Sequence, residues 1–303
     1  TSGGATINNN SVNGTGALIF TGTFSNAGLS GAKTLTLGGT NTDNNEIQSA
    51  LGDGGNGGTL AVTKTAGGTW VLSGLNSYTG STTINQGILS INSIADGGTS
   101  SAIGAGSVIN FGSGAQTGTL FYSGAAARTN RTLNLASAGA GGATIYASGT
   151  GALIFTGSVT NVATTGTKIL TLNGTATGND FQGVISDGSL GGVVAVTKAD
   201  TGTWLLSGLN TFTGAASINR ASLTVNSIAD SGTASALGAG TMLNLGSAAQ
   251  TGTLIYTGTG GSTNRAIVLA STSTGGGTIT NNGSGSLLFT GSFSNTGTAA
   301  KTF

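Results

Sequence analysis

The segment Gly68–Gly106, GTWVLSGLNSYTGSTTINQGILSINSIADGGTSSAIGAG, comes back at Gly202–Gly240 as GTWLLSGLNTFTGAASINRASLTVNSIADSGTASALGAG. Without gaps, 25 of the 39 positions are identical. Self-similarity at a fixed period, here about 134 residues, is the sequence signature of repeat architectures. We therefore predict one continuous solenoid over residues 1–303, with repeat units at 1–142, 143–276 and, incompletely, 277–303.

The third copy starts near Gly277 and stops in mid-repeat at Phe303. The chain also starts in mid-repeat, with no initiator Met. Solenoids normally carry atypical terminal repeats that act as caps, and this sequence has none. We expect these 303 residues to be a window of a longer array.

Composition narrows the possible classes of protein. Charged residues are 6% of the chain and the net charge is +1, whereas ordinary domains carry about 25% charged residues. A nucleic-acid or anionic-membrane partner needs a basic patch, so we predict neither. The chain has no Cys and no His, which excludes disulfides, thiolate metal sites and the usual catalytic triads. No apolar run approaches the length of roughly 18 residues that suggests a transmembrane helix.

Apolar residues alternate with polar ones in short runs along the whole chain. Leu35 and Leu37 lie in KTLTLGG, and Trp70 and Leu72 lie in TWVLSG. Alternation over four to six residues between Gly, Asn, Ser and Asp turns predicts half-buried β-strands. The chain contains no Pro, which suits strands whose backbone N–H groups are used in ladders. The sequence therefore predicts an all-β protein that buries one side of each strand.

The spacing of these runs distinguishes between all-β folds. The runs recur at intervals of about 17 to 24 residues, which favours a parallel β-helix with two or three strands per coil. Six coils of about 22 residues would then make one repeat unit. Stacked coils lie about 4.8 Å apart, so the whole window would be a rod of about 65 Å. A β-sandwich or a transmembrane barrel is the alternative, but a barrel needs longer strands and aromatic girdles.

The segment Gly68–Asn92 resembles the passenger-associated β-strand repeat of bacterial autotransporters. Fifteen residues carry the resemblance: Gly68, Thr69, Trp70, Leu72, Ser73, Gly74, Asn76, Ser77, Tyr78, Thr79, Gly80, Thr82, Ile84, Gly87 and Leu89. The second copy departs at Ala221, which replaces the late Gly. The resemblance implies a right-handed parallel β-helix, export across two bacterial membranes and an extracellular or cell-surface location. It does not imply one activity, because fold does not fix function.

The acidic residues are candidates for catalysis or metal binding, and a structural role is favoured. They are Asp43, Glu46, Asp53, Asp96, Asp180, Asp187, Asp200 and Asp230. Glycoside hydrolysis needs a pair of carboxylates, but Asp53/Asp187 and Asp96/Asp230 recur at predicted turns, where Asp commonly binds its own backbone. Thr42–Glu46 and Leu51–Leu60 resemble oxygen-ligand loops without following a known calcium motif. We predict no catalytic, cofactor-binding or metal-binding residue, and no cofactor.

Three further sets of residues have a functional and a structural interpretation. Aromatic side chains could stack on sugars, but alternation places them in the core: Trp70/Trp204 and Tyr78/Phe212. The cations would form sparse rows that aid solubility and register: Arg131/Arg265, Lys64/Lys198 and Lys33/Lys168/Lys301. Threonine pairs could bind ice if one pair occurred per coil, but their spacing is irregular: Thr34/Thr36 and Thr278/Thr280.

These observations favour a non-enzymatic, extracellular β-solenoid segment of a large bacterial surface protein, acting as a stiff stalk, a scaffold or an adhesin. The alternative is a building block of a self-assembling extracellular fibre. A carbohydrate-active enzyme on the same fold is a third class. The expected partners are further copies of the repeat, in this chain or in neighbouring ones, and glycans of the cell surface or matrix.

Overall fold

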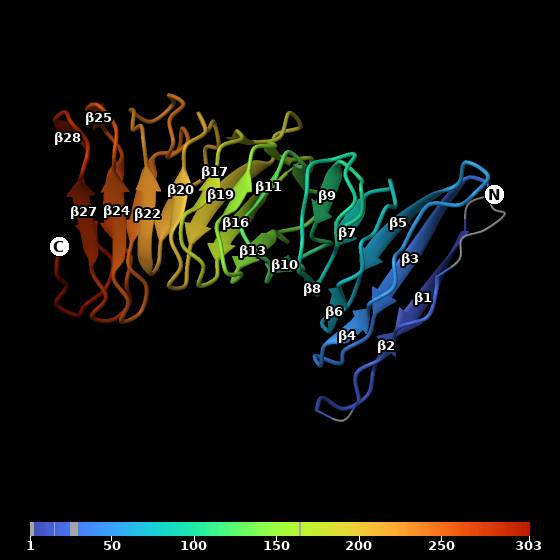
Figure 1. Cartoon of the computed structure of the whole chain (residues 1–303). Helices are drawn as coiled ribbons and strands as arrows, with labels where there is room; N and C mark the ends of the chain where they lie inside the picture. The colour runs from blue at the N-terminus through green and yellow to red at the C-terminus, as the bar shows by residue number, and fades with distance from the viewer. Residues whose placement is uncertain (1–2, 15, 25–29, 164) are drawn as a thin grey trace.

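The computed structural model describes residues 3–14, 16–24, 30–163 and 165–303. Strands, turns and bends make up this part of the chain. The third copy matches the first most closely between Gly285–Gly297 and Gly16–Gly28, and the latter segment lies partly outside the described residues. The coils follow one another from the N-terminal to the C-terminal end of an elongated body, with the two termini at opposite ends (Figure 1).

The strands form three long sheets and one short one, which are the faces of the solenoid. The first face contains β1 (Gly3–Asn8), β3 (Ala32–Gly38), β5 (Thr59–Lys64), β7 (Thr82–Ile84), β9 (Val108–Phe111), β12 (Thr132–Leu135), β15 (Val159–Asn161) and β18 (Ile185–Ser186).

The second face contains β2 (Ile19–Phe20), β4 (Asn45–Ile47), β6 (Thr69–Leu72), β8 (Gly87–Ile91), β10 (Gly118–Tyr122), β13 (Ala143–Ala147), β16 (Thr167–Asn173), β19 (Val193–Lys198), β21 (Ala216–Ile218), β23 (Met242–Leu245), β26 (Ala266–Leu269) and β29 (Phe293–Asn295).

The third face contains β11 (Ala127–Thr129), β14 (Leu153–Phe155), β17 (Asn179–Phe181), β20 (Trp204–Leu206), β22 (Ala221–Val225), β24 (Gly252–Tyr256) and β27 (Gly277–Asn281). A two-stranded sheet, β25 (Gly261–Thr263) and β28 (Leu287–Phe289), takes the place of the first face in the last coils.

All of these pairings are parallel, and each strand pairs with the strand that lies one coil away in the sequence. Backbone hydrogen bonds therefore run along the rod axis. This confirms the predicted all-β parallel β-solenoid. Its handedness stays a prediction.

The coil length predicted from the sequence is wrong. The structure has about 11 turns of about 26 residues each, instead of coils of about 22. The predicted six coils per repeat unit are wrong for the same reason. Starting at Val62, five pairings lead along the first face to Ile185. The repeat offset carries Val62 to Val196, which lies on the second face, in β19. One repeat unit thus covers five coils and about one third of a sixth.

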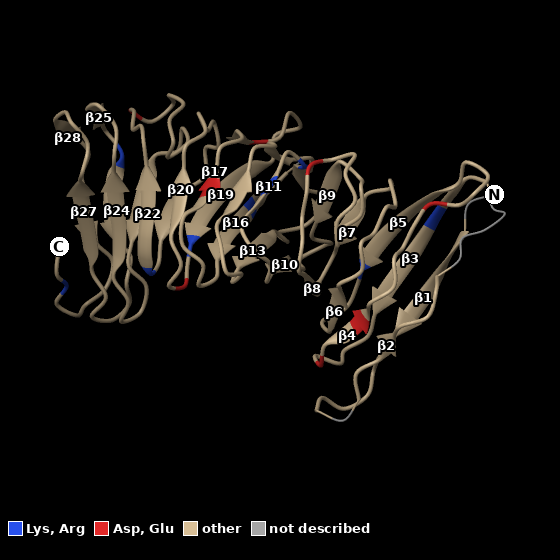
Figure 2. Cartoon of the chain, in the orientation of Figure 1, with Lys and Arg blue, Asp and Glu red and all other residues tan. Residues whose placement is uncertain are grey.

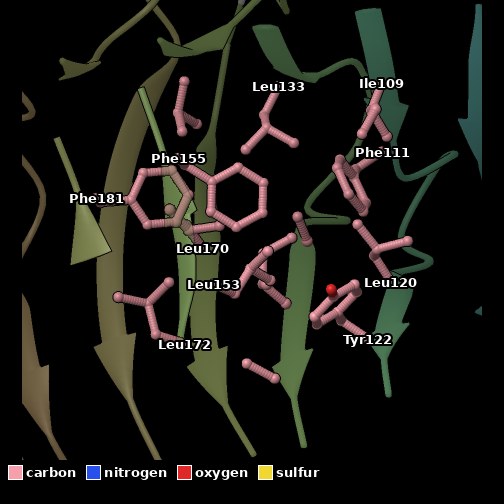
Figure 3. Packing of buried hydrophobic residues seen from close by; sticks show 14 of the residues in the cluster. Ile109, Phe111, Leu120, Tyr122, Leu133, Leu153, Phe155, Leu170, Leu172 and Phe181 are labelled. Carbon is pink, nitrogen blue, oxygen red and sulfur yellow. The ribbon is translucent and has the colours of Figure 1, made fainter. Parts of the chain in front are cut away.

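The core fills the space that the faces enclose. Residues at alternate positions of each strand point inward and are buried, as Leu133 and Leu135 do in β12. Their side chains meet those of neighbouring coils in continuous files (Figure 3). On the third face, Phe155 stacks on Phe181 with ring centroids 4.6 Å apart, and Phe181 stacks on Trp204 at 5.8 Å. Each such large apolar side chain contributes about 1.5–3 kcal/mol when fully buried.

Candidate functional site

The candidate carboxylates accept hydrogen bonds from the chain itself. Asp53 accepts from the backbone N of Leu60, at 2.7 Å, and from the hydroxyl of Thr79, at 2.6 Å. Asp187 repeats this arrangement one unit later, with Val194 and Thr213. Partial burial alone would raise the pKa of Asp53, but these hydrogen bonds to the ionised form outweigh it and lower the pKa. Both carboxylates thus tie a turn to the coil that follows it, and the structural interpretation of this Asp pair stays a prediction.

Five of the other acids also accept hydrogen bonds. Asp96 accepts from the backbone N of Asn130, at 2.8 Å. Asp180 accepts from Ser207, and Glu46 makes the equivalent contact with Ser73. Two further acids also bind their neighbours: Asp43 accepts from the backbone N of Gly14, and Asp200 accepts from the hydroxyl of Tyr146. Within the described ranges, no three of the acidic side chains gather in a group that could hold a metal ion.

The repeated aromatic residues lie in the core, as alternation predicts. Trp70 and Trp204 are buried, and each indole N–H donates to a backbone carbonyl of the preceding coil. Tyr78 is fully buried, and its hydroxyl is 2.7 Å from that of Thr82. One unit later this buried hydroxyl pair becomes Phe212 and Ala216, so both hydroxyls are lost together. The exchange of Tyr78 for Phe212 therefore accompanies the exchange of Thr82 for Ala216, and the sequence reasoning missed this coupling.

The two arginines are not surface residues, so their predicted role in solubility is wrong. Arg131 and Arg265 are each only 1% exposed. The Arg131 guanidinium donates to the carbonyls of Ala95, at 2.9 Å, and Gly104, at 2.7 Å. Arg265 makes equivalent bonds to residues 229, 237, 238 and 240. Burial lowers the pKa of both guanidinium groups. In each repeat unit the guanidinium donates the hydrogen bonds that hold one loop in place.

Three of the lysines are also buried, which corrects the same prediction. Lys64 Nζ donates to the carbonyls of Thr65, at 2.6 Å, and Ala66, at 2.7 Å. Lys198 does the same one unit later, and burial lowers the pKa of both amines to about 8. Lys168 is buried with its amine against the Gly139 carbonyl. Cations at these corners satisfy carbonyls that the strand ladders leave unpaired.

The remaining candidates have a surface location. Lys33 is half-buried, and Lys301 donates to Asn295 at 2.6 Å. Charged residues are sparse over the whole rod (Figure 2). Thr34 and Thr36 point outward from β3, but Thr34 stands between Gly4 and Ala61 in the register. The threonine pairs therefore do not recur once per coil, as the irregular spacing predicted.

The arginines hold a joint between a short coil and a long one. Leu72 pairs with Ile91, and Ile91 pairs with Tyr122, so the coil between the first two residues is much shorter than the coil that follows. Residues 93–106 of the long coil fold back over the short coil and form an antiparallel bridge between Asn76 and Ser101. The short coil thus obtains its third side from the residues that follow it. The same joint recurs with a bridge from Asn210 to Ser235.

A buried asparagine connects three coils at each joint. The side-chain oxygen of Asn76 accepts from the backbone N of Leu51, at 2.7 Å, in the preceding coil. Its amide donates to the Ala102 carbonyl, at 2.5 Å, in the folded-back loop. Asn210 makes the equivalent bonds to Ile185 and Ala236. The recurring SGLN at Ser73–Asn76 was a signal for this role.

An aromatic pair on the second face lies on the outer surface, and the sequence reasoning overlooked it. Phe121 and Tyr146 come from adjacent strands of the second face and stack with centroids 5.1 Å apart and planes at 18°. Both are partly exposed. The alternation that places Leu120 and Tyr122 inward also requires Phe121 to point outward, so the signal was available.

Together these features define a class of protein: a parallel β-solenoid with paired short and long coils that recur at the offset of the sequence repeat. The model of the passenger-associated-transport-repeat family matches residues 62–91 and 196–225. Each matched segment contains a short coil and the residues that enter it. The chain therefore carries two copies of this repeat.

The chain is similar to the adhesin BmaC autotransporter of Brucella suis biovar 1 (strain 1330). The two are 39% identical over an alignment of 222 residues, and the match covers 70% of this chain. The aligned part spans about 6% of the length of that relative. No solved structure matches the chain. Within the described residues, no helix has the length and apolar character needed to cross a membrane.

Proposed function

We propose that this chain is a non-enzymatic, rigid spacer within the exported passenger of a bacterial autotransporter, positioned on the cell surface. Two passenger-associated repeats and the likeness to an adhesin autotransporter support this location. The repeat units 1–142, 143–276 and 277–303 would then be consecutive parts of a longer array.

The observation that carries this proposal is the ladder of the second face. Its twelve strands run in parallel register from β2 to β29, and a single core cluster lies beneath them. Each coil shares hydrogen bonds and buried side chains with the coils on both sides, so bending the rod would break many contacts at once. Such a ladder holds whatever follows it at a fixed distance from the cell surface.

Electron microscopy of the complete natural protein tests the proposal. Coils about 4.8 Å apart with about 26 residues each give about 0.2 Å of rod per residue. We expect the length of isolated rods to match the mass of one denatured chain at this ratio. Rods much longer than one chain allows would favour the self-assembling fibre, and globular particles would refute the spacer.

A further inference from the structure

Two outward aromatic side chains of the second face, and an Asp in the turn after β19, do not recur at the repeat offset. Phe121 and Tyr146 become Ile255 and Thr280 one unit later, although both positions stay in paired strands of one ladder. Asp200 corresponds to Ala66 one unit earlier. The backbone at residues 66 and 200 is left-handed in both cases, with φ 56° and 61°. The fold accepts small or aliphatic residues at these positions, so it does not itself require the aromatic pair or the carboxylate.

The geometry orients the aromatic pair. Tyr146 donates its hydroxyl to Asp200 Oδ2 at 2.8 Å, two coils further on, and this bond raises the pKa of Tyr146. The Tyr146 ring therefore leans toward the C-terminal end, over Asn173, whose side-chain oxygen is buried. Phe121 stacks on the other side of that ring. The remaining face of Phe121 is turned toward its N-terminal neighbour in the register, the small residue Ser90.

A row of hydroxyl groups runs beside the aromatic pair Phe121 and Tyr146. Thr119, Thr144, Thr171 and Thr197 occupy one outward file, one residue per coil. Coils are about 4.8 Å apart, so the row offers hydrogen-bond donors and acceptors at that spacing. Phe121, Ser90 and the threonine row together form a surface with one apolar side and one hydrogen-bonding side.

The charges around this surface select the kind of ligand. The cations on these strands, Lys168 and Lys198, point inward with their amines bound to backbone carbonyls. The charged side chains that act on Lys198 are the half-buried Asp200 and the exposed Arg220, which carry opposite charges. The surface therefore offers no excess of either sign to a polyanion or a polycation. The file of four threonines also favours a ligand that exchanges hydrogen bonds over an apolar peptide or a lipid.

We propose that the surface formed by Phe121, Tyr146, Ser90 and the threonine row is a binding subsite for a neutral glycan. A pyranose ring would lie over Ser90 with its C–H face against Phe121, because the negative face of an aromatic ring attracts weakly positive hydrogens. The chain of sugars would continue along the threonine row and exchange hydrogen bonds with it. Tyr146 and Asp200 are positioning residues that hold Phe121 in place. This function goes beyond that of a spacer, because the length of the rod does not determine whether the rod binds a glycan.

Saturation-transfer NMR on this chain tests the subsite. The probes are neutral hexasaccharides built from glucose, mannose or galactose, with polygalacturonate as the charged comparison. We expect transfer to at least one neutral probe with a Kd of about 1 mM or below. Phe121→Ile should weaken binding by about tenfold or more. Asp200→Ala, which frees Tyr146, should weaken it less.

The chain supplies its own matched controls. Ile and Ala are the residues that stand at the corresponding positions in the other unit, so both variants should fold. Hydrogen exchange in β10 and β13 verifies that they do. Absence of transfer to every neutral probe, or equal binding by wild type and Phe121→Ile, would overturn the subsite. Neither result would alter the rod lengths on which the spacer proposal depends.

Discussion

Replacing Arg131 with Met tests whether a buried cation holds the joint between the short and long coils. Met has a similar length and no hydrogen-bond donor. The change would leave the carbonyls of Ala95 and Gly104 without the guanidinium bonds at 2.9 and 2.7 Å. Both carbonyls belong to the folded-back loop of residues 93–106, which completes the short coil.

The size of the effect follows from these two bonds. A hydrogen bond to a charged group contributes about 1.5–3 kcal/mol. Both carbonyls keep a second donor, Thr129 Oγ1 on Ala95 and Ser101 Oγ on Gly104, so the loss is that of the two guanidinium bonds. We expect the free energy of local opening to fall by about 3–5 kcal/mol. In hydrogen exchange, the amides of Ser101 and Ala105, which donate to Asn76 and Tyr78, should then exchange faster by roughly two to four orders of magnitude. Arg131→Lys should rescue only part of the loss, because an amine lacks the planar fork of donors.

The chain provides two controls for this experiment. Arg128 is exposed on the third face, and Arg128→Met should leave exchange in the loop unchanged. Arg265→Met should open residues 227–240 and spare residues 93–106. If Arg131→Met changed loop exchange by less than about threefold, or weakened all coils equally, the proposed clamp would be refuted.

Two further predictions concern buried polar groups. Tyr78→Phe and Thr82→Ala should each lower the unfolding free energy by about 1–2 kcal/mol, because each removes the hydrogen bond between the two buried hydroxyls. The double variant, which copies the second repeat, should cost less than the sum of the two in a urea titration. The free energy of unfolding should also rise as the pH rises from about 8 toward 10.5. The folded-state pKa values of Lys64 and Lys198 lie near 8, below the ordinary value of 10.5. The unfolded chain therefore binds more protons than the folded chain in this window, and raising the pH favours the folded chain. The paired Lys→Met variant should abolish this rise between pH 8 and 9.5, and a rise that persists would assign it to other groups.

The sequence predicted the class of fold because alternation and repetition are local properties. It could not give the coil length, because strands on all three faces show the same inward alternation. The runs ending at Ile91, Phe111 and Leu135 look equally spaced, but the first lies on the second face and the other two on the first. Only the pairing register shows which strand stacks on which. The sequence therefore yielded a correct architecture with coils that were too short.

The cations were misplaced for a related reason. A rare charged residue between polar neighbours, such as Arg131 in TNRTLNL, looks like a surface residue. Its burial depends on a loop that approaches from the preceding coil and reaches it at Gly104. Nothing in the local pattern around the arginine indicates that approach. The recurrence of the arginine and of the loop at the same offset was the available signal, since a surface charge has no reason to persist with one particular loop.

The repeat unit does not contain a whole number of coils, and this determines how its loops are arranged in a longer array. Because one unit covers five coils and about one third of another, each unit is turned by one face relative to the unit before it. The joint of the first unit occupies the third face, between β6 and β7, whereas the joint of the second lies between β20 and β21, in the place of the first face. Corresponding loops would return to the same side only after three units. A sequence repeat that ends between coils thus distributes its loops around the rod, while the core positions, which face the axis from every side, stay interchangeable.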